Sequence, residues 1–288
     1  MKAKRFLITG SAGQLGKEFK EILAKRNLQF DAPPEAECDI TNFTQTKEIV
    51  SQIKPDIIVN CAAYNNVDEA EANPELAHLV NSKAVENLAQ LCKKSNIFLV
   101  HYSSDYVFDG KKGDLYTEVD TPNPLNEYGK SKLSGENITR DSLTDYLVFR
   151  TSWVIGRGKQ NFLYKLMNWA KENRVLKISS DETSVPTYTE DIANVTLLSL
   201  ERGLNGLYHL TNSGYASRYE LAKYFIDKME LENVIIPVCA SVFSARATRP
   251  LFSAMSNKRI SKELSISISH WKKGVDRFIE ILKNQKVL

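Results

Sequence analysis

Short apolar runs alternate with longer amphipathic stretches through the first half of the chain. The apolar runs predict buried strands, which lie at residues 5–9, 28–31, 57–60, 97–102 and 146–150. The stretches between them carry apolar residues at helical spacing and predict helices at residues 15–25, 44–53, 75–94 and 126–140. Strands that are almost continuously apolar are typical of a parallel sheet with helices on both faces. The pattern therefore predicts an α/β fold with a doubly wound, Rossmann-type parallel sheet.

The rhythm changes after residue 150. Helical periodicity recurs at residues 162–172, 189–200, 219–229 and 270–283, strand-like runs lie at 207–210 and 234–238, and residues 240–255 follow neither pattern. No repeat, low-complexity tract or long linker separates the halves, so we expect them to be interleaved. Residues 1–150 would form the Rossmann domain, joined by parts of 151–240, and residues 151–288 a smaller substrate-binding lobe.

Composition narrows the class of protein. The chain has 288 residues, 42% of them hydrophobic and 25% charged, which is ordinary for a globular protein. A net charge of +3 is too small to indicate a nucleic-acid partner. No apolar run reaches the roughly 18 residues that span a bilayer, and the run after the basic N-terminus is too short for a signal peptide. The four cysteines have neither metal-ligand nor Cys-x-x-Cys spacing, so we expect reduced thiols, no metal centre and a cytoplasmic location.

A glycine-rich turn follows the first predicted strand. Gly10, Gly13 and Gly16 lie between that strand and a predicted helix, in the spacing Gly-x-x-Gly-x-x-Gly. Glycines there allow a tight turn and a close approach of the backbone to a pyrophosphate, which the helix N-terminus also favours. A packing turn without a ligand is the alternative, and the strand–turn–helix context favours the nucleotide. The expected cradle comprises Gly10, Ser11, Ala12, Gly13, Gln14, Leu15 and Gly16.

The end of the second strand offers a carboxylate for the same cofactor. Asp31 lies about 20 residues after the glycine turn, where a carboxylate can bind both ribose hydroxyls. It could equally begin the turn at Pro33. Asp39 and Ile40 could touch an adenine, or their segment could cap the helix that begins near Phe43. After the third strand, the small residues of the segment 61–63 either leave room for the cofactor or serve close packing.

Tyr128 and Lys132 form the most informative pair in the chain. They are four residues apart in a predicted helix, so their side chains would share one face. An ammonium beside a phenol lowers the pKa of the phenol, which could then exchange a proton near neutral pH. Ser104 follows the fourth strand and either binds the reacting oxygen or caps a turn. The spacing alone is common on surface helices, but together with the glycine turn it predicts hydride chemistry on a carbonyl or carbinol.

Taken in order, these motifs resemble the extended short-chain dehydrogenase/reductase family and, within it, the dTDP-4-dehydrorhamnose reductases. The resemblance covers nearly the whole chain and is carried by residues 9–16, 39–42, 55–64, 67–71, 103–110, 124–132, 150–153, 161–162, 186–187 and 249–250. It implies reduction of the C4 ketone of a dTDP-linked 6-deoxy sugar, with NADPH or NADH as cofactor, in nucleotide-sugar and cell-surface polysaccharide biosynthesis. The assembly would be a monomer or a homodimer. Some family members bridge subunits with Mg²⁺, but the sequence offers no acidic cluster for it.

The resemblance also implies roles for single residues. Tyr128 would donate the proton to the carbonyl oxygen, Lys132 would hold the nicotinamide ribose and depress the tyrosine pKa, and Ser104 would polarise the ketone. Further cofactor contacts would come from Asp31, Asp39, Ile40, Cys61, Ala62, Ala63, Tyr64, Asn65 and Tyr102. Substrate contacts would come from Asp105, Val107, Trp153, Asn161, Phe162, Pro186, Thr187 and Arg249, with Arg249 facing the diphosphate.

The chain departs from the family pattern in several places. Ser104 and Asn65 stand where threonines are usual, and Glu182 and Ser184 replace a glutamine and a glycine. Arg249 is single where two adjacent arginines are common. A reductase of a different nucleotide sugar is therefore one alternative. Another is a non-catalytic, cofactor-binding regulatory subunit similar to the methionine adenosyltransferase β-subunit, against which the intact tyrosine–lysine pair argues.

Overall fold

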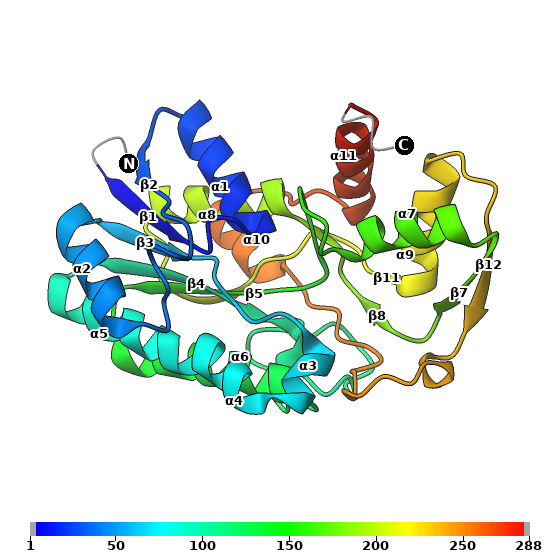
Figure 1. Cartoon of the computed structure of the whole chain (residues 1–288), viewed down its shortest axis with the longest axis horizontal. Helices are drawn as coiled ribbons and strands as arrows, with labels where there is room; N and C mark the ends of the chain where they lie inside the picture. Colours follow the sequence, from blue (N-terminus) through cyan, green and yellow to red (C-terminus); the bar gives the residue numbers. More distant parts are fainter. Residues whose placement is uncertain (1–3, 285–288) are drawn as a thin grey trace.

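The computed structural model describes residues 4–284 (Figure 1). At its centre is a sheet of six parallel strands in the order β10-β5-β4-β3-β1-β2. These strands are β1 (Arg5–Thr9), β2 (Gln29–Asp31), β3 (Ile57–Asn60), β4 (Phe98–Ser104), β5 (Tyr146–Thr151) and β10 (Gly206–His209). The predicted α/β fold with a doubly wound parallel sheet is confirmed.

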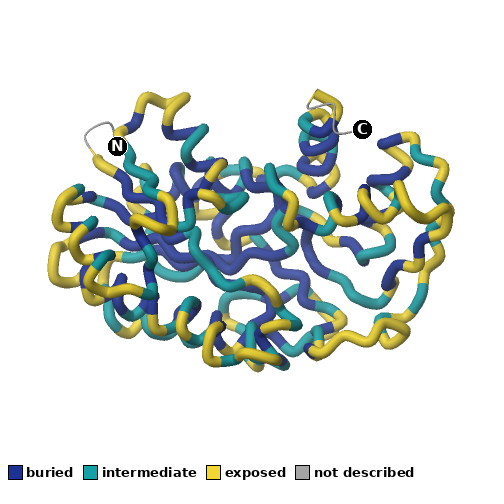
Figure 2. The backbone as a smooth tube through the Cα atoms, viewed as in Figure 1, coloured by how far each residue is buried: buried dark blue, intermediate teal, exposed yellow. Residues whose placement is uncertain are grey.

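Helices cover both faces of this sheet. On one face lie α1 (Gln14–Lys25), α8 (Thr189–Glu201) and α10 (Lys258–Leu264), and on the other α2 (Phe43–Ile53), α5 (Ala84–Ser95) and α6 (Glu127–Ser142). Successive side chains of a strand point to opposite faces of the sheet. In β1, Phe6 and Ile8 pack in the core under α1 and α8, while Leu7 packs in the core under α2 and α5. Figure 2 shows the buried strands between their more exposed helices.

A second lobe lies beyond one end of the sheet (Figure 1). It contains β6 (Val154–Ile155), α7 (Phe162–Glu172), β7 (Val175–Ser179), β8 (Thr183–Ser184), β9 (Thr187–Tyr188), β11 (Ala216–Ser217), α9 (Arg218–Lys228), β12 (Val234–Val238) and α11 (Trp271–Asn284). Its strands pair two by two, as β6 with β9, β7 with β12 and β8 with β11. A separate apolar core built around Leu163, Phe225, Trp271 and Phe278 holds it together.

The chain passes between the two lobes more than once. After β5 it enters the second lobe, and it returns to the sheet with α8 and β10 and again with α10. Strand β10 pairs with β5 in parallel, from Gly206 beside Leu147 to His209 beside Arg150. The two lobes are therefore joined by several crossings of the chain.

Some elements differ from the sequence prediction. The predicted helix at 75–94 is broken into α4 (Pro74–His78), a π-helical turn η1 (Leu79–Lys83) and α5. Helix α3 (Val67–Ala72), α10 and strand β7 were not predicted. Both helices are too short to show a clear periodicity. The irregular segment 240–255 holds only the 3₁₀ turn η3 (Ala240–Val242). Within residues 4–284, no helix is long and apolar enough to cross a membrane.

Candidate active site

The glycine turn lies at the point where the strand order reverses. β1 has β2 on one side and β3 on the other, and in such sheets ligands bind outside the carboxyl ends of the strands at this point. Gly10 has φ +63°, and an added Cβ would lie 2.5 Å from the backbone nitrogen of Ala62. An added Cβ on Gly16 would collide with the Gly10 carbonyl. Only glycine fits either position, because the turn packs directly against neighbouring backbone there.

The N-terminus of α1 fits a pyrophosphate. The helix begins at Gln14, with Gly13 as N-cap and no side chain that caps its first N–H groups. Such free N–H groups and the helix dipole attract an anion. The hydroxyl of Ser11 donates to the carbonyl of Pro33 at 2.8 Å, which ties the turn to the loop after β2. Residues 10–16 therefore have the backbone geometry of a dinucleotide cradle.

The end of β2 and the loop after it contain the candidate contacts to an adenosine. Both carboxylate oxygens of Asp31 accept hydrogen bonds from the Arg5 guanidinium, at 2.7 and 3.2 Å. Asp39 accepts from the backbone and hydroxyl of Thr41, and Ile40 is buried in the core beside α2. The cap predicted for the next helix is confirmed, because the Asn42 side chain accepts from the Gln45 N–H at the start of α2.

The loop after β3 is held by a residue that the sequence did not indicate. Asn81, in the π-helical turn, bonds both the N–H and the carbonyl of Tyr64, each at 2.9 Å. Its amide also donates to the Ser131 hydroxyl at 3.0 Å, and that hydroxyl donates to the Tyr128 carbonyl. The strip that begins at Cys61 is thus anchored to α6. A π-helical turn often marks a functional site, but its register cannot be read from an amphipathic pattern.

Tyr128 lies in the first turn of α6, beside the end of β4. Asn126 caps this helix by accepting from the Gly129 N–H at 2.8 Å. An added Cβ on Gly129 would collide with the carbonyl of Tyr106, so glycine allows the helix to approach the loop after β4. The Tyr106 ring meets the Tyr128 ring edge-on, with centroids 5.8 Å apart. Ser104 lies close enough to the Tyr128 hydroxyl to influence its pKa, so the structure brings these two predicted residues together.

The pKa values of the pair differ from the sequence expectation. Burial raises the pKa of Tyr128, as do Asp105 and Tyr106, while the nearby Ser104 hydroxyl lowers it. Burial lowers the pKa of Lys132 to about 8, against the opposing effect of Glu136. In this structure Lys132 is not among the groups that shift the Tyr128 pKa, so the expected lowering of that pKa is not seen. Burial has the largest effect instead, and local spacing does not reveal burial.

Asp105 lies near Tyr128 and joins segments that are remote in sequence. It is buried, and its carboxylate accepts from the hydroxyls of Ser104 at 3.1 Å, Ser184 at 2.8 Å and Ser253 at 2.6 Å. Burial raises the pKa of Asp105, and these hydrogen bonds oppose the rise. Ser184 and Ser253 belong to segments remote in sequence, so only the fold could reveal their convergence.

Trp153 and its neighbours form the wall of the second lobe at the hollow between the lobes. Trp153 adopts φ +40°, which is uncommon for a bulky residue, and its carbonyl accepts from the Thr187 N–H at 3.2 Å. Pro186 and Thr187 are buried. The Arg218 guanidinium lies over the Trp153 ring, 3.5 Å from its centroid, and 5.0 Å from the centroid of Phe162. Arg218 was not predicted, because nothing in its local sequence marks it.

Arg249 approaches from the irregular segment of the second half. Its guanidinium donates to both carboxylate oxygens of Asp68, at 2.7 and 3.2 Å. The same carboxylate accepts from the backbone of Arg246 and Ala247. Asp68 therefore holds both the loop and its arginine, and it lowers the freedom of Arg249 to turn elsewhere.

Three predicted site residues have side chains that are engaged within the protein. Val107 is fully buried in an apolar cluster with Phe108. Tyr102 lies in the sheet core, where its hydroxyl shares a hydrogen bond with Thr196 at 2.9 Å. Asn161 caps α7, and its amide donates to the Gln14 side chain at 2.9 Å, so it lies beside the glycine turn.

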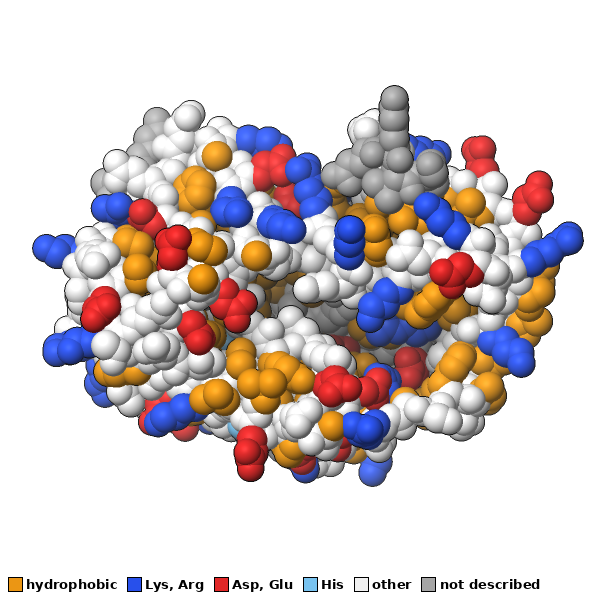
Figure 3. Space-filling view, viewed as in Figure 1, with side chains coloured by type: hydrophobic (Ala, Val, Ile, Leu, Met, Phe, Trp, Pro, Cys, Tyr) orange, Lys and Arg blue, Asp and Glu red, His pale blue; other side chains and the backbone are white. Residues whose placement is uncertain are grey.

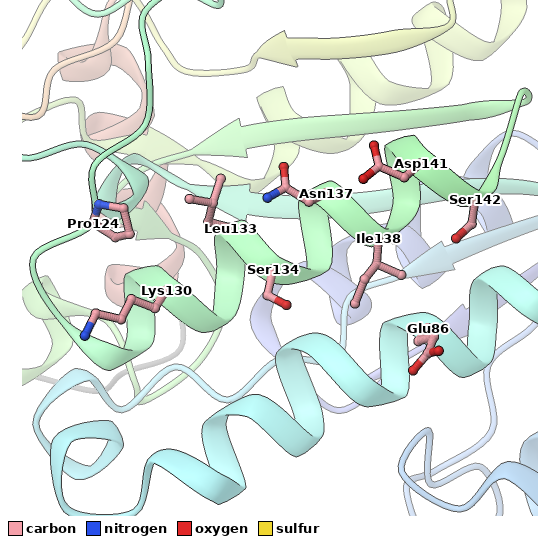
Figure 4. A pocket seen from close by; sticks show the side chains of 9 residues that line it. All are labelled: Glu86, Pro124, Lys130, Leu133, Ser134, Asn137, Ile138, Asp141 and Ser142. Carbon is pink, nitrogen blue, oxygen red and sulfur yellow. The ribbon is translucent and has the colours of Figure 1, made fainter.

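The surface shows where a ligand can enter. Figure 3 shows the molecule hollowed between its two lobes, with Lys and Arg side chains on the rim. Another groove runs along α6 and reaches α5 (Figure 4), and it is lined by Glu86, Pro124, Lys130, Leu133, Ser134, Asn137, Ile138, Asp141 and Ser142. Among residues 4–284, no group of three His, Cys, Asp or Glu side chains could hold a metal ion.

Comparison with known proteins gives matches over nearly the whole chain. A family model described as the RmlD substrate binding domain matches residues 4–284. The dTDP-4-dehydrorhamnose reductase of Salmonella typhimurium is 33% identical over 287 residues, covering 95% of this chain and 96% of its own. A spore coat polysaccharide biosynthesis protein of Bacillus subtilis is 33% identical and covers 96% and 97%. The crystal structure of dTDP-4-dehydrorhamnose reductase from Bacillus anthracis in complex with NADP has a TM-score of 0.93 at 33% identity, covering 97% of this chain and 99% of that chain.

Proposed function

This chain belongs to the RmlD substrate binding domain family, and on that premise we propose that it reduces the C4 ketone of a dTDP-linked 6-deoxy sugar with NADPH or NADH. The substrate is dTDP-4-dehydrorhamnose and the product dTDP-rhamnose, as the names of its relatives suggest. The observation that carries the proposal is the placement of the half-buried Tyr128 beside Ser104, at the sheet edge that also carries the glycine turn. That edge is where a cofactor and a carbonyl would meet.

The chain has the features that a nicotinamide dinucleotide needs. The backbone of residues 10–16 would hold the pyrophosphate, and the strip after β3 would lie beside the cofactor. Asp31 would bind the adenosine ribose if it exchanged the Arg5 guanidinium for the hydroxyls. Lys132 would bind the nicotinamide ribose. The bound cofactor supplies the hydride that the ketone carbon accepts.

Tyr128 would supply the proton. Because its pKa is raised, the phenol is protonated at neutral pH and can donate when the ketone oxygen gains charge. Ser104 would donate its own hydrogen bond to that oxygen and orient the carbonyl. The ketone carbon gains a hydride and its oxygen gains the proton of Tyr128, which leaves a secondary alcohol. Lys132, with a pKa of about 8, would help to return a proton to the tyrosine.

The second lobe would bind the rest of the substrate. Trp153, Phe162 and Thr187 lie on its wall, Asp105 lies near the tyrosine, and Arg249 would face the diphosphate. We place the enzyme in the cytoplasm, since its four cysteines are all unpaired thiols. Its assembly is a monomer or a homodimer, which light scattering on the full chain distinguishes.

The test is turnover. The full chain should oxidise NADPH or NADH only when dTDP-4-dehydrorhamnose is added, and absorbance measures this directly. Tyr128→Phe removes only the hydroxyl, so turnover should fall by about 10²–10⁴-fold while cofactor affinity stays the same. A variant with most of its activity would remove Tyr128 as proton donor. Cofactor binding without turnover of any dTDP- or UDP-linked 4-keto sugar would favour the non-catalytic subunit instead.

A further inference from the structure

Arg218 is held firmly in the hollow between the lobes. It is the first residue of α9, which is capped by the reciprocal hydrogen bonds of Ser217 and Glu220. Its backbone N–H donates to the carbonyl of Glu182 at 3.0 Å. Its guanidinium stacks on the Trp153 ring at 3.5 Å, close enough for a cation–π contact. The backbone and the plane of this side chain are therefore both fixed.

The N–H groups of the same guanidinium have no acceptor. Within residues 4–284 the Arg218 side chain donates no hydrogen bond, and the Glu182 carboxylate lies 3.8 Å away, too far for one. The side chain is only 20% exposed. A guanidinium presents five donors, and those of Arg218 are not among the fully buried side-chain atoms that lack a partner, so they remain open to a ligand from the hollow. A fixed, half-buried cation with free donors is the arrangement expected of an anion site before its ligand binds.

Three other guanidinium groups that are at least half-buried are already engaged. Arg249 bonds both oxygens of Asp68, and Arg277 bonds Glu190 at 2.8 Å and Asp191 at 2.5 Å. Arg150 forms a buried ion pair with Glu136. Arg218 differs from these in having its charge compensated only at a distance.

Arg218 also lies near the proposed proton donor. Tyr106 and Asp105 both act electrostatically on it, and the Tyr106 ring packs edge-on against the Tyr128 ring. The glycine turn of the first lobe would take the pyrophosphate of the cofactor. A second phosphate-bearing ligand that enters from the other lobe needs a cation there, and a planar fork suits paired phosphate oxygens.

We propose that Arg218, stacked on Trp153, binds the diphosphate of the substrate and is the main cation that selects nucleotide-diphosphate sugars. The identity of that substrate rests on the proposed function, whereas the anion site rests on the geometry of Arg218 alone. Trp153 acts as the platform for the guanidinium, which accounts for a bulky residue kept at φ +40°.

The test compares dTDP with thymidine, which lacks the phosphates. Calorimetry on the full chain should show that Arg218→Met weakens dTDP binding by about 10- to 150-fold, the range for a hydrogen bond to a charged group, and leaves thymidine binding unchanged. Arg259→Met is the matched control, because Arg259 also stacks on an aromatic ring, that of Tyr208 at 4.8 Å, but on α10 at the sheet. That variant should bind dTDP like the unaltered chain.

Equal dTDP affinity in a folded Arg218→Met variant would overturn the proposal, as would an equal loss for thymidine and dTDP. Should that variant fail to fold, Arg218→Lys keeps the charge but not the planar fork, and it should still bind dTDP more weakly; unchanged affinity there would also overturn the proposal. The two hypotheses fail separately. An enzyme that turns over the dTDP-sugar with a normal KM in Arg218→Met refutes the anion site alone. A chain that binds dTDP through Arg218 but reduces no 4-keto sugar refutes the reductase alone.

Discussion

Replacing Lys132 with methionine should stabilise this protein while it impairs its chemistry. The lysine is only 3% exposed, and burial lowers its pKa from 10.5 to about 8. At about 1.4 kcal/mol per pKa unit, keeping this ammonium charged at pH 7 costs about 3 kcal/mol relative to an exposed lysine. Methionine has a similar aliphatic stem and no charge. Lys132→Met should therefore raise the free energy of unfolding at pH 7 by an amount on the order of 3 kcal/mol.

The extra stability of Lys132→Met should depend on pH, and the pKa shift of Lys132 determines in which direction it changes. Between about pH 8 and 10.5 the unfolded chain keeps the Lys132 proton that the folded chain has released. Through that window, the free energy of unfolding of the unaltered protein therefore rises with pH because of Lys132. The difference between variant and unaltered protein should be largest at pH 7 and should vanish near pH 10.5. Taking the difference cancels the titration of the other buried groups.

Urea denaturation of both proteins across this pH range measures the effect. Lys130→Met is the matched control in the same helix, because Lys130 is 52% exposed and pairs with Glu127 at the surface. That change should alter stability by no more than about 0.5 kcal/mol at any pH. Equal or lower stability of Lys132→Met at pH 7, or a difference that does not change with pH, would refute the reasoning. Its turnover and its affinity for NADPH should both fall.

Three further changes test the cofactor and substrate sites. Gly10→Ala should weaken NADPH binding and destabilise the fold by more than about 1 kcal/mol, since φ is +63° and the Ala62 backbone occupies the space; calorimetry and urea melts with normal values would contradict this. Asp31→Ala should shift the ratio of kcat/KM for NADPH over NADH upward, because a carboxylate repels the 2′-phosphate, and an unchanged ratio would mean that Asp31 does not contact the ribose. Arg249→Ala should raise the KM of the dTDP-sugar by about tenfold at constant cofactor affinity, less than Arg218→Met, because Asp68 already engages this guanidinium; a normal KM would remove Arg249 from the site.

The strands of the sheet could be predicted because each is a local apolar run. The predicted bounds of β1 and β3 agree with the structure, since parallel strands buried on both faces contain little but apolar residues. The glycine turn was equally local, as its tight backbone approach requires glycine at positions fixed by sequence spacing. The pairing of Tyr128 with Lys132 on one helix also needed no tertiary information, because α6 forms across both.

What the sequence could not supply depends on burial and on contacts between remote segments. Asp105 accepts hydrogen bonds from the hydroxyls of Ser184 and Ser253 because the chain crosses repeatedly between the lobes. The same crossings bring Arg218 to the Trp153 ring. The direction of the Tyr128 pKa shift likewise followed from the low dielectric around it and not from the lysine one turn away. Local pattern fixed the sheet, the cradle and the helical pair, whereas the charges and partners of the site were decided by packing, which removes water and joins residues that no sequence window contains.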